Sequence, residues 1–342
     1  MSFGKETVAV FYNSTNKDKH SIKLSEQTRQ FALESRKGKY GLETMQTQYV
    51  SVDYVQEQDY KRLSAIDKYD IAIRAIASKA PIRICAGEKI SGSATLGGAV
   101  LCKVPATRSG EVVFSGISHI AIECEPVVRT GLIGLRKAIV AALKDNGDAG
   151  KKRFLYSAIT NIDSMVLWHR RYLEELKTRP EYKQNYNNLL KVPLVPAENF
   201  YQAVQSIWFI FAFTRLCGNL PEIGNVANLL EEYLRRDLDK GILTIEEARD
   251  ILAHFIIKGL EWICDENDSV NMPHYKSLII SKESTVSSLI SDITEELGIC
   301  ALSVTEPAFE HNEQLPCTVI SLFKHECIEQ CCSYLDLFCK GK

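Results

Sequence analysis

The sequence has no hydrophobic run long enough to cross a membrane and no excess of charge of one sign. Its most apolar stretch, IWFIFAF at residues 207–213, is far shorter than the about 20 residues that a membrane-spanning helix needs. Lys and Arg number 41 against 43 Asp and Glu, a formal net charge of −2, and no basic block stands out. We therefore expect neither a nucleic-acid partner nor a membrane partner.

The N-terminus also lacks the apolar core of a secretion signal. The chain has 11 cysteines, and most lie among apolar neighbours, as Cys85, Cys102, Cys217 and Cys264 do. Without a secretion signal, reduced thiols that pack as small apolar side chains are favoured over disulfides. We expect a cytoplasmic protein.

Apolar periodicity predicts that residues 61–265 are mainly helical. Apolar residues recur every three or four positions over 55–80 and 126–146, and a longer helix is expected over 152–177. We expect the first of these helices to end at Pro81.

The most apolar stretch predicts a buried core helix that runs to Cys217, where Gly218 closes it. Thr244 and Glu247 form a capping box that begins another helix, extending to about residue 264. The helix between these two is expected to carry ion pairs four residues apart, Glu231 with Arg235 and Glu232 with Arg236.

Residues 1–60 and 266–342 have a different character. The first segment is polar, with weak strand patterns at TVAVFY and TQYVSV, and we treat it as an N-terminal arm. In the last segment KSLIISK and CTVISLF are typical of strands, SSLISDITEELG between them of a helix, and HECIEQCCSYLDLFCKGK of a final helix. The fold class is therefore α-rich α/β, with a strand–helix alternation that begins and is not completed.

Residues 83–119 are rich in glycine and are expected to be loop with short extended pieces. Gly87 and Gly92 have the outer spacing of a phosphate-binding loop, but Ser93 and Ala94 follow where that motif has Lys and Ser/Thr. We therefore expect these glycines to serve backbone turns rather than nucleotide binding.

Five blocks of the sequence, in order, resemble the N-terminal region of the pyruvate formate-lyase family of glycyl radical enzymes. The blocks are RICAGEKISGSATLG, SGISHIAIECEPVVRTGLIGL, FYQAVQSIWFIFAFTRLCGN, GNVANLLEEYLRRDLDKGILTIEEARDIL and HFIIKGLEWI. The resemblance covers residues 69–262 and continues more loosely to the end. It implies an α/β barrel wrapped in helices, of which this chain would hold the helical shell and the first strands, an incomplete barrel.

The family's chemistry depends on two residues that this chain is expected to lack. A thiyl cysteine lies on a loop inside the barrel, and a radical glycine lies in an Arg-Val-x-Gly loop, where a radical S-adenosylmethionine activase installs the radical. No Arg-Val-x-Gly segment occurs in this sequence, and it reaches Lys342 where the cysteine half of the fold is expected to begin. We therefore expect no catalytic residue, no bound cofactor and no activity from this chain alone.

The resemblance assigns candidate substrate-binding residues. His119 in GISHI occupies a position where many family members have a substrate-facing histidine. The loop that contains Cys217 and Asn219 matches a family loop that often contacts substrate. Thr107 and Arg108 are further candidates, because an arginine offers a bidentate fork to a carboxylate.

Two further residues weigh on these assignments. Leu220 stands where diol-dehydrating relatives have a hydrogen-bonding residue, which disfavours a diol substrate. His169, beside Trp168 on a predicted helix, is interpreted as a structural residue.

The C-terminal cysteines are interpreted as helix residues rather than as a metal site. Cys327, Cys331, Cys332 and Cys339 follow a C-x3-C-C-x6-C spacing, which matches neither paired zinc ligands nor an iron–sulfur motif. An amphipathic helix whose thiols face a core accounts for them. We predict no metal ligand in this chain.

Three functional hypotheses stay open. The first is the N-terminal portion of a radical lyase or formate acetyltransferase that takes a small metabolite. The second is one subunit of a split enzyme, completed by a C-terminal chain. The third is a non-catalytic protein that binds the metabolite or the activase. A homodimer is compatible with each of them.

Overall fold

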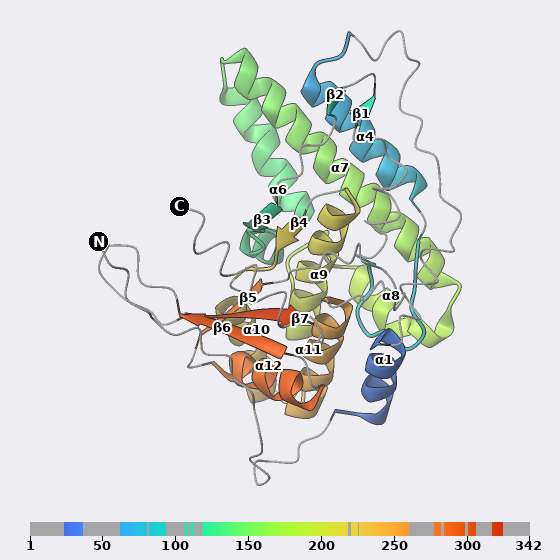
Figure 1. The fold of residues 1–342 in the computed structure, drawn as a ribbon. Helices are drawn as coiled ribbons and strands as arrows, with labels where there is room; N and C mark the ends of the chain where they lie inside the picture. Colours follow the sequence, from blue (N-terminus) through green and yellow to red (C-terminus); the bar gives the residue numbers. More distant parts are fainter. Residues whose placement is uncertain are drawn as a thin grey trace, which may run out of the picture.

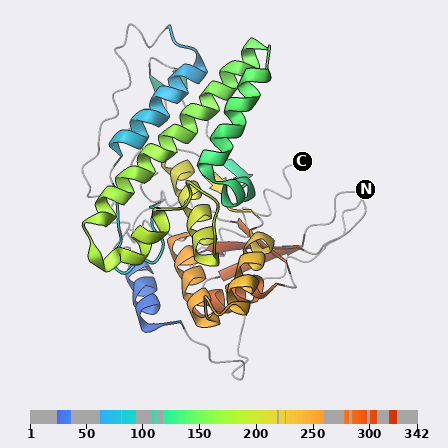
Figure 2. The same cartoon turned by 180° about the vertical axis from the view of Figure 1, so that it is seen from behind.

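The protein is built around one buried helix, as seen in a computed structural model (Figure 1). Helix α9 (Phe200–Leu216) contacts α6, α8, α10 and α11. Helices α4, α6 and α7 lie above it in Figure 1, and α10, α11 and α12 lie below with a small sheet; Figure 2 shows the same arrangement from behind. The structure describes residues 24–36, 62–80, 82–93, 107–108, 111–112, 118–217, 220–224, 226–259, 277–281, 284–297, 300–305 and 317–323.

The helices and strands have the following bounds. The helices are α1 (Glu26–Arg36), α4 (Ala65–Lys79), α6 (Glu125–Asp145), α7 (Ala149–Lys177), the 3-10 helix η1 (Pro180–Tyr182), α8 (Lys183–Leu189), α9 (Phe200–Leu216), α10 (Ala227–Asp239), α11 (Ile245–Gly259) and α12 (Thr285–Glu296). The strands are β1 (Thr107–Arg108), β2 (Glu111–Val112), β3 (Ser118–Ala121), β4 (Leu220–Glu222), β5 (Ser277–Ser281), β6 (Cys300–Thr305) and β7 (Cys317–Phe323).

Helix α9 is the predicted core helix. Asn199 caps it by accepting a hydrogen bond from Gln202 N at 2.9 Å, and Cys217 ends it. Because the helix is apolar on nearly every face, it is stable only where other elements surround it. Trp208 and Phe209 are accordingly fully buried, and Trp168 of α7 packs against Phe209 with ring centroids 4.6 Å apart.

A half-buried ion network joins α4 to α7. Ser64 caps α4, which begins at Ala65 and so is shorter than the predicted helix over 55–80. Arg153 of α7 lies 2.9 Å from Asp70 of α4, and Ser157 donates to the same carboxylate. The network fixes the rotation of α4 on α7.

Helix α6 is broken at Gly131, which the periodicity did not predict. Gly131 has φ 70° and ψ 165°. At this opening Leu132 N donates to Pro193 O at 2.8 Å, and Ile133 N donates to Leu194 O at 3.0 Å. Carbonyl oxygens of the segment before α9 thus accept hydrogen bonds that carbonyl oxygens within α6 would accept in an unbroken helix.

The capping box of α11 is confirmed. Thr244 N donates to Glu247 Oε2 at 2.8 Å, and Glu247 N donates to Thr244 Oγ1 at 3.2 Å. The other boundaries predicted between residues 126 and 217 also agree within a few positions.

One of the two predicted ion pairs on α10 is wrong. Arg235 binds Glu231 at 2.8 Å as expected, but Glu232 binds Arg129 of α6 at 3.0 Å. Arg236 instead donates to Glu198 O at 2.7 Å and contacts Asp237. A partner on another element competes with the neighbour four residues away, and pattern alone does not show it.

The strand pattern was only partly predicted. Strands β5 and β7 and helix α12 lie where expected, but β6 was missed. The sheet order is β5-β7-β6 with both pairs antiparallel. Strands β3 and β4 make a further pair inside the region interpreted as helix and loop.

Helix α1 lies within the segment interpreted as an arm with weak strand patterns. It docks on α11, because Ser25 N donates to Asp250 Oδ1 at 3.1 Å and Leu24 N donates to Glu296 of α12 at 3.0 Å. Phe31 stacks on His254 with centroids 4.5 Å apart. These partners lie over 200 positions away, so the sequence alone did not indicate them.

Several predictions fall on residues that the structure does not describe. They concern the TVAVFY and TQYVSV strands and the final helix with Cys327, Cys331, Cys332 and Cys339. The helix end predicted just before Pro81 is confirmed, because α4 ends at Lys79 with Ala80 as its C-cap. The division into 1–60, 61–265 and 266–342, like the incomplete barrel, stays a prediction. Among the described helices, none is both long and apolar enough to cross a membrane.

Candidate functional site

A parallel strand pair brings two of the predicted site segments together. Strand β3 carries His119, and β4 begins three residues after Cys217. Their register pairs Ser118 with Leu220 and Ala121 with Glu222, with an irregularity between the two positions. Segments about 100 positions apart therefore lie side by side between α6 and α9 (Figure 1).

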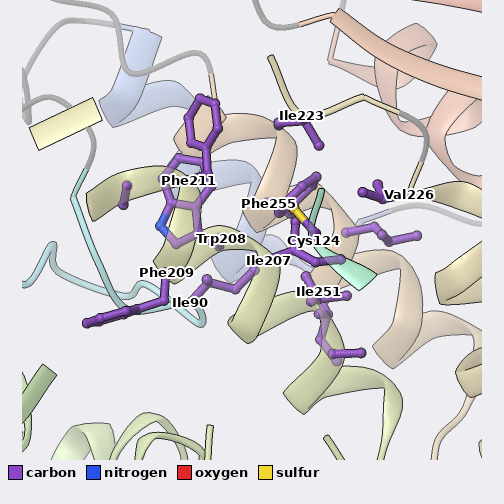
Figure 3. Close-up of a cluster of buried hydrophobic side chains, with 14 of the residues drawn as sticks. Ile90, Cys124, Ile207, Trp208, Phe209, Phe211, Ile223, Val226, Ile251 and Phe255 are labelled. Atoms are coloured by element: carbon purple, nitrogen blue, oxygen red, sulfur yellow. The ribbon is translucent and has the colours of Figure 1, made fainter. Parts of the chain in front are cut away.

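Two buried thiols flank these strands. Cys124 follows β3 at the start of α6, and Cys217 ends α9 just before β4. Burial raises the pKa of Cys124 to about 12 and also raises that of Cys217. Figure 3 shows Cys124 among apolar side chains such as Ile207 and Phe255. Both thiols stay protonated near neutral pH, so neither is an activated nucleophile.

The segment over residues 82–93 is fixed against the core by side chains from α8, α9 and α11. Gln205 Oε1 accepts from Ser91 N at 2.8 Å, and Gln205 Nε2 donates to Ser91 O at 2.8 Å. Trp208 Nε1 donates to Gly92 O at 2.8 Å. Gly87 and Gly92 have φ 78° and 110°, which confirms that they serve backbone turns.

A fully buried ion pair completes this attachment. Lys258 Nζ lies 2.7 Å from Glu88 Oε2, with side-chain exposures of 1% and 0%. Lys258 also donates to Ile90 O at 2.6 Å, and Glu88 Oε2 accepts from Cys85 N at 3.1 Å. Burial raises the pKa of Glu88, which the ammonium of Lys258 opposes. The pair holds the turn rather than offering a free acid or base.

His254 lies one turn before Lys258 on the same face of α11. Its Nδ1 accepts from Lys89 N at 3.3 Å, so Nε2 carries the proton and donates to Thr28 Oγ1 at 3.3 Å. Burial, reinforced by Lys89 and Lys258 and opposed by Asp250, lowers its pKa to about 3. His254 is therefore a neutral link between the turn, α1 and α11.

The other predicted site residues are not gathered at the β3–β4 pair. Thr107 and Arg108 form β1, which pairs with β2 in a separate antiparallel sheet. Asn219 lies outside the described residues. Cys217 is 3% exposed and belongs to the core. Their substrate roles thus rest on the resemblance.

The structural interpretation of His169 is confirmed. Its Nε2 lies 2.7 Å from Leu189 O, the residue is fully buried, and burial lowers its pKa to about 4. No group of three metal-ligating side chains occurs in the described part of the chain.

Sequence reasoning missed the polar stripe formed by Asp250, His254 and Lys258. These residues recur every fourth position in DILAHFIIK, an otherwise apolar helical segment. Charged side chains are rarely buried unless they are paired. Polar side chains at every fourth position of a core helix indicate that each has a buried partner on another element. This pattern was visible in the sequence.

Comparisons with known proteins agree with this arrangement. The model of the pyruvate formate lyase-like family matches residues 103–275, half of the chain. An isethionate sulfite-lyase from Oleidesulfovibrio alaskensis is 28% identical over 147 residues, which are 37% of this chain and 18% of that protein. An indoleacetate decarboxylase from Tractidigestivibacter scatoligenes is 27% identical over 161 residues, which are 43% and 17%.

The fold also matches a solved structure. The B12-independent glycerol dehydratase from Clostridium butyricum has a TM-score of 0.60 and 16% identity, covering 83% of this chain and 47% of that one. The chain thus spans about a fifth of the curated relatives and under half of this solved structure. Because the family match covers half of the chain and includes β3, α9 and β4, the chain belongs to the pyruvate formate lyase-like family of glycyl radical enzymes.

Proposed function

We propose that this chain is the substrate-holding N-terminal portion of a glycyl radical lyase that acts on a small metabolite. The observation that carries the proposal is the parallel pairing of β3 with β4. It sets the strand of His119 beside the strand that follows Cys217, and the family resemblance assigns substrate contacts to both segments. Strand β4 follows α9 and contacts it, and such an attachment to a buried helix suits a preorganised binding site.

The ligand class we favour is a small organic anion. The two sequence relatives are named for isethionate and indoleacetate, a sulfonate and a carboxylate. His119 on β3 would supply a hydrogen bond to such a group, and Arg108, on the separate β1–β2 pair, is proposed to supply a bidentate fork from its residue type alone. Leu220 on β4 has no hydrogen-bonding side chain, which argues against a diol.

This chain would bind and orient the ligand, and the radical chemistry would come from elsewhere. The sequence contains no Arg-Val-x-Gly segment to hold a glycyl radical. We therefore expect no turnover by the chain alone. The thiyl cysteine and radical glycine loops of a formate acetyltransferase-type or lyase-type enzyme, together with an activase, would supply that chemistry.

A split enzyme is the second candidate, and the sheet near the C-terminus favours it. In the described part of the chain, β5 and β6 each pair only with β7, so each has one outer edge without a strand partner. Open strand edges invite pairing with another chain.

Cytoplasmic location, anaerobic metabolism and assembly of two copies remain part of the proposal.

Binding of isethionate and indoleacetate to the full chain tests the proposal by titration calorimetry. We expect His119→Ala and Arg108→Ala each to weaken binding by about tenfold, the loss of one charge-assisted hydrogen bond. Arg170→Ala is the matched control, because Arg170 is exposed on α7, and it should bind as the wild type does. Equal binding by all three variants would contradict the assignment, and absence of binding by the wild type would contradict the proposed function.

A further inference from the structure

A large groove lies apart from the β3–β4 pair. Its volume is about 1060 Å³, and its lining residues come from α1, the turn at 86–89, η1, α8, the start of α9, and α10 and α11. None of them belongs to β3 or β4. Pockets that bind ligands usually measure about 300–1,000 Å³, so this groove is large enough for several side chains.

Carboxylates that pair with no cation of the described residues stand around the groove. Glu26 of α1, Glu181 of η1 and Glu247 of α11 are exposed. Within the described residues, none of the three lies within ion-pair distance of a cation, and Glu247 bonds only to its own capping residue. Lys89 is the single cation in the described lining, and its ammonium already binds Asp250 at 3.1 Å. The groove is therefore negatively charged.

Glu88 is a further carboxylate of the lining, and it is paired with Lys258. It also lines the groove, although the residue is only 3% exposed. Its Oε2 binds Lys258 and Cys85 N, but its buried Oε1 accepts no hydrogen bond from any described residue. Because Oε1 is itself buried, ligand binding in the groove does not depend on a bond to it, and Glu88 serves to hold the turn that forms one wall of the groove.

The groove also has an apolar part that is open to solvent. Ile242, in the turn between α10 and α11, is 59% exposed, and Leu243 beside it is half-buried. Ile251 and Phe31 line the groove more deeply. An apolar surface ringed by carboxylates matches a cationic group on an aliphatic stem, as lysine and arginine have.

We propose that this groove binds an extended peptide segment that carries lysine or arginine side chains. The amide side chains favour a peptide over a small polyamine. Gln27 and Gln184 line the groove without another hydrogen-bond partner among the described residues, and an amide offers both a donor and an acceptor. A peptide backbone satisfies both, whereas a polyamine offers only donors.

Fluorescence anisotropy of a labelled peptide of alternating lysine and glycine, titrated with the full chain, tests the proposal. We expect the triple variant Glu26→Gln, Glu181→Gln and Glu247→Gln to weaken binding by about tenfold, because it removes three ion pairs at the surface. Glutamine keeps the capping geometry at position 247. We also expect Ile242→Ser to weaken binding without altering the charge of the groove.

The matched control removes three exposed carboxylates outside the groove, Asp145→Asn, Glu174→Gln and Glu295→Gln. It should bind as the wild type does. The proposal is overturned if both triple variants weaken binding equally, which would indicate general attraction to an acidic protein. It is also overturned if Ile242→Ser binds normally, if the peptide does not bind, or if spermidine displaces it at equal concentration.

Discussion

At the scale of single residues, the buried pair of Lys258 and Glu88 decides how residues 82–93 are held. Neither charge reaches solvent, and both partners make further hydrogen bonds to the backbone of this segment. Burying a charge is favourable only when the partner and the remaining hydrogen bonds are in place. The pair thus mainly fixes the position of residues 82–93 and adds little to the net free energy of unfolding.

We predict that Lys258→Met lowers the free energy of unfolding by about 3–5 kcal/mol, because it leaves Glu88 buried and unpaired. Adding Glu88→Gln should restore part of the loss, since glutamine is neutral and still accepts from Cys85 N. Urea unfolding followed by circular dichroism measures both changes. The control Lys89→Met breaks a pair whose lysine is 32% exposed, and it should cost about 1 kcal/mol or less. Equal losses at the two lysines would refute the role of burial.

At the scale of elements, Gly131 decides how α6 meets the segment before α9. A Cβ at this position would lie 2.4 Å from Leu194 O and 2.5 Å from Val195 Cα. The backbone also has a positive φ that disfavours any other residue. The break in α6 and the close approach of the segment before α9 therefore both depend on this glycine.

Gly131→Ala is expected to lower the free energy of unfolding by about 2–5 kcal/mol, from backbone strain and overpacking combined. Gly147→Ala is the control, because nothing lies within 4 Å of a Cβ there. It should change stability by no more than about 0.5 kcal/mol. Chemical unfolding measures the free energy of unfolding of the two variants. Similar losses in both would mean that the segment before α9 shifts to accommodate the new methyl group.

At the scale of the whole molecule, two neutral buried histidines make stability depend on pH. His169 and His254 have folded-state pKa values of about 4 and about 3, below the ordinary value of 6.5, mainly because burial disfavours the charged form. Between pH 6.5 and the folded-state pKa of each histidine, the unfolded chain binds more protons than the folded chain. Their contribution is complete above pH 6.5 and declines as the pH falls through this window.

We predict that the free energy of unfolding declines by up to about 1.4 kcal/mol per histidine for each pH unit below 6.5. Urea unfolding at several pH values from 7.5 to about 5 measures the slope, before most carboxylates titrate. His254→Gln should lower the slope of the free energy of unfolding against pH by the contribution of one proton, up to about 1.4 kcal/mol per pH unit. Glutamine keeps a polar contact with α1. An unchanged slope in that variant would show that His254 does not titrate on unfolding.

The sequence by itself determined the features that depend on near neighbours. Cys217, Thr244 and Glu247 mark helix ends through bonds within a few residues, so their pattern was sufficient. The order of the five sequence blocks also predicted the family, because each block keeps a local pattern.

Only the tertiary structure decided the features that join distant residues. The β3–β4 pair, the contact of Glu232 with Arg129, the pairing of Lys258 with Glu88 and the docking of α1 all span about 100 positions or more. Such contacts arise from competition among many possible partners once the core has formed, and no local pattern records the outcome. The candidate site shows both cases, since the motif makes His119 a candidate and only the fold places its strand beside β4.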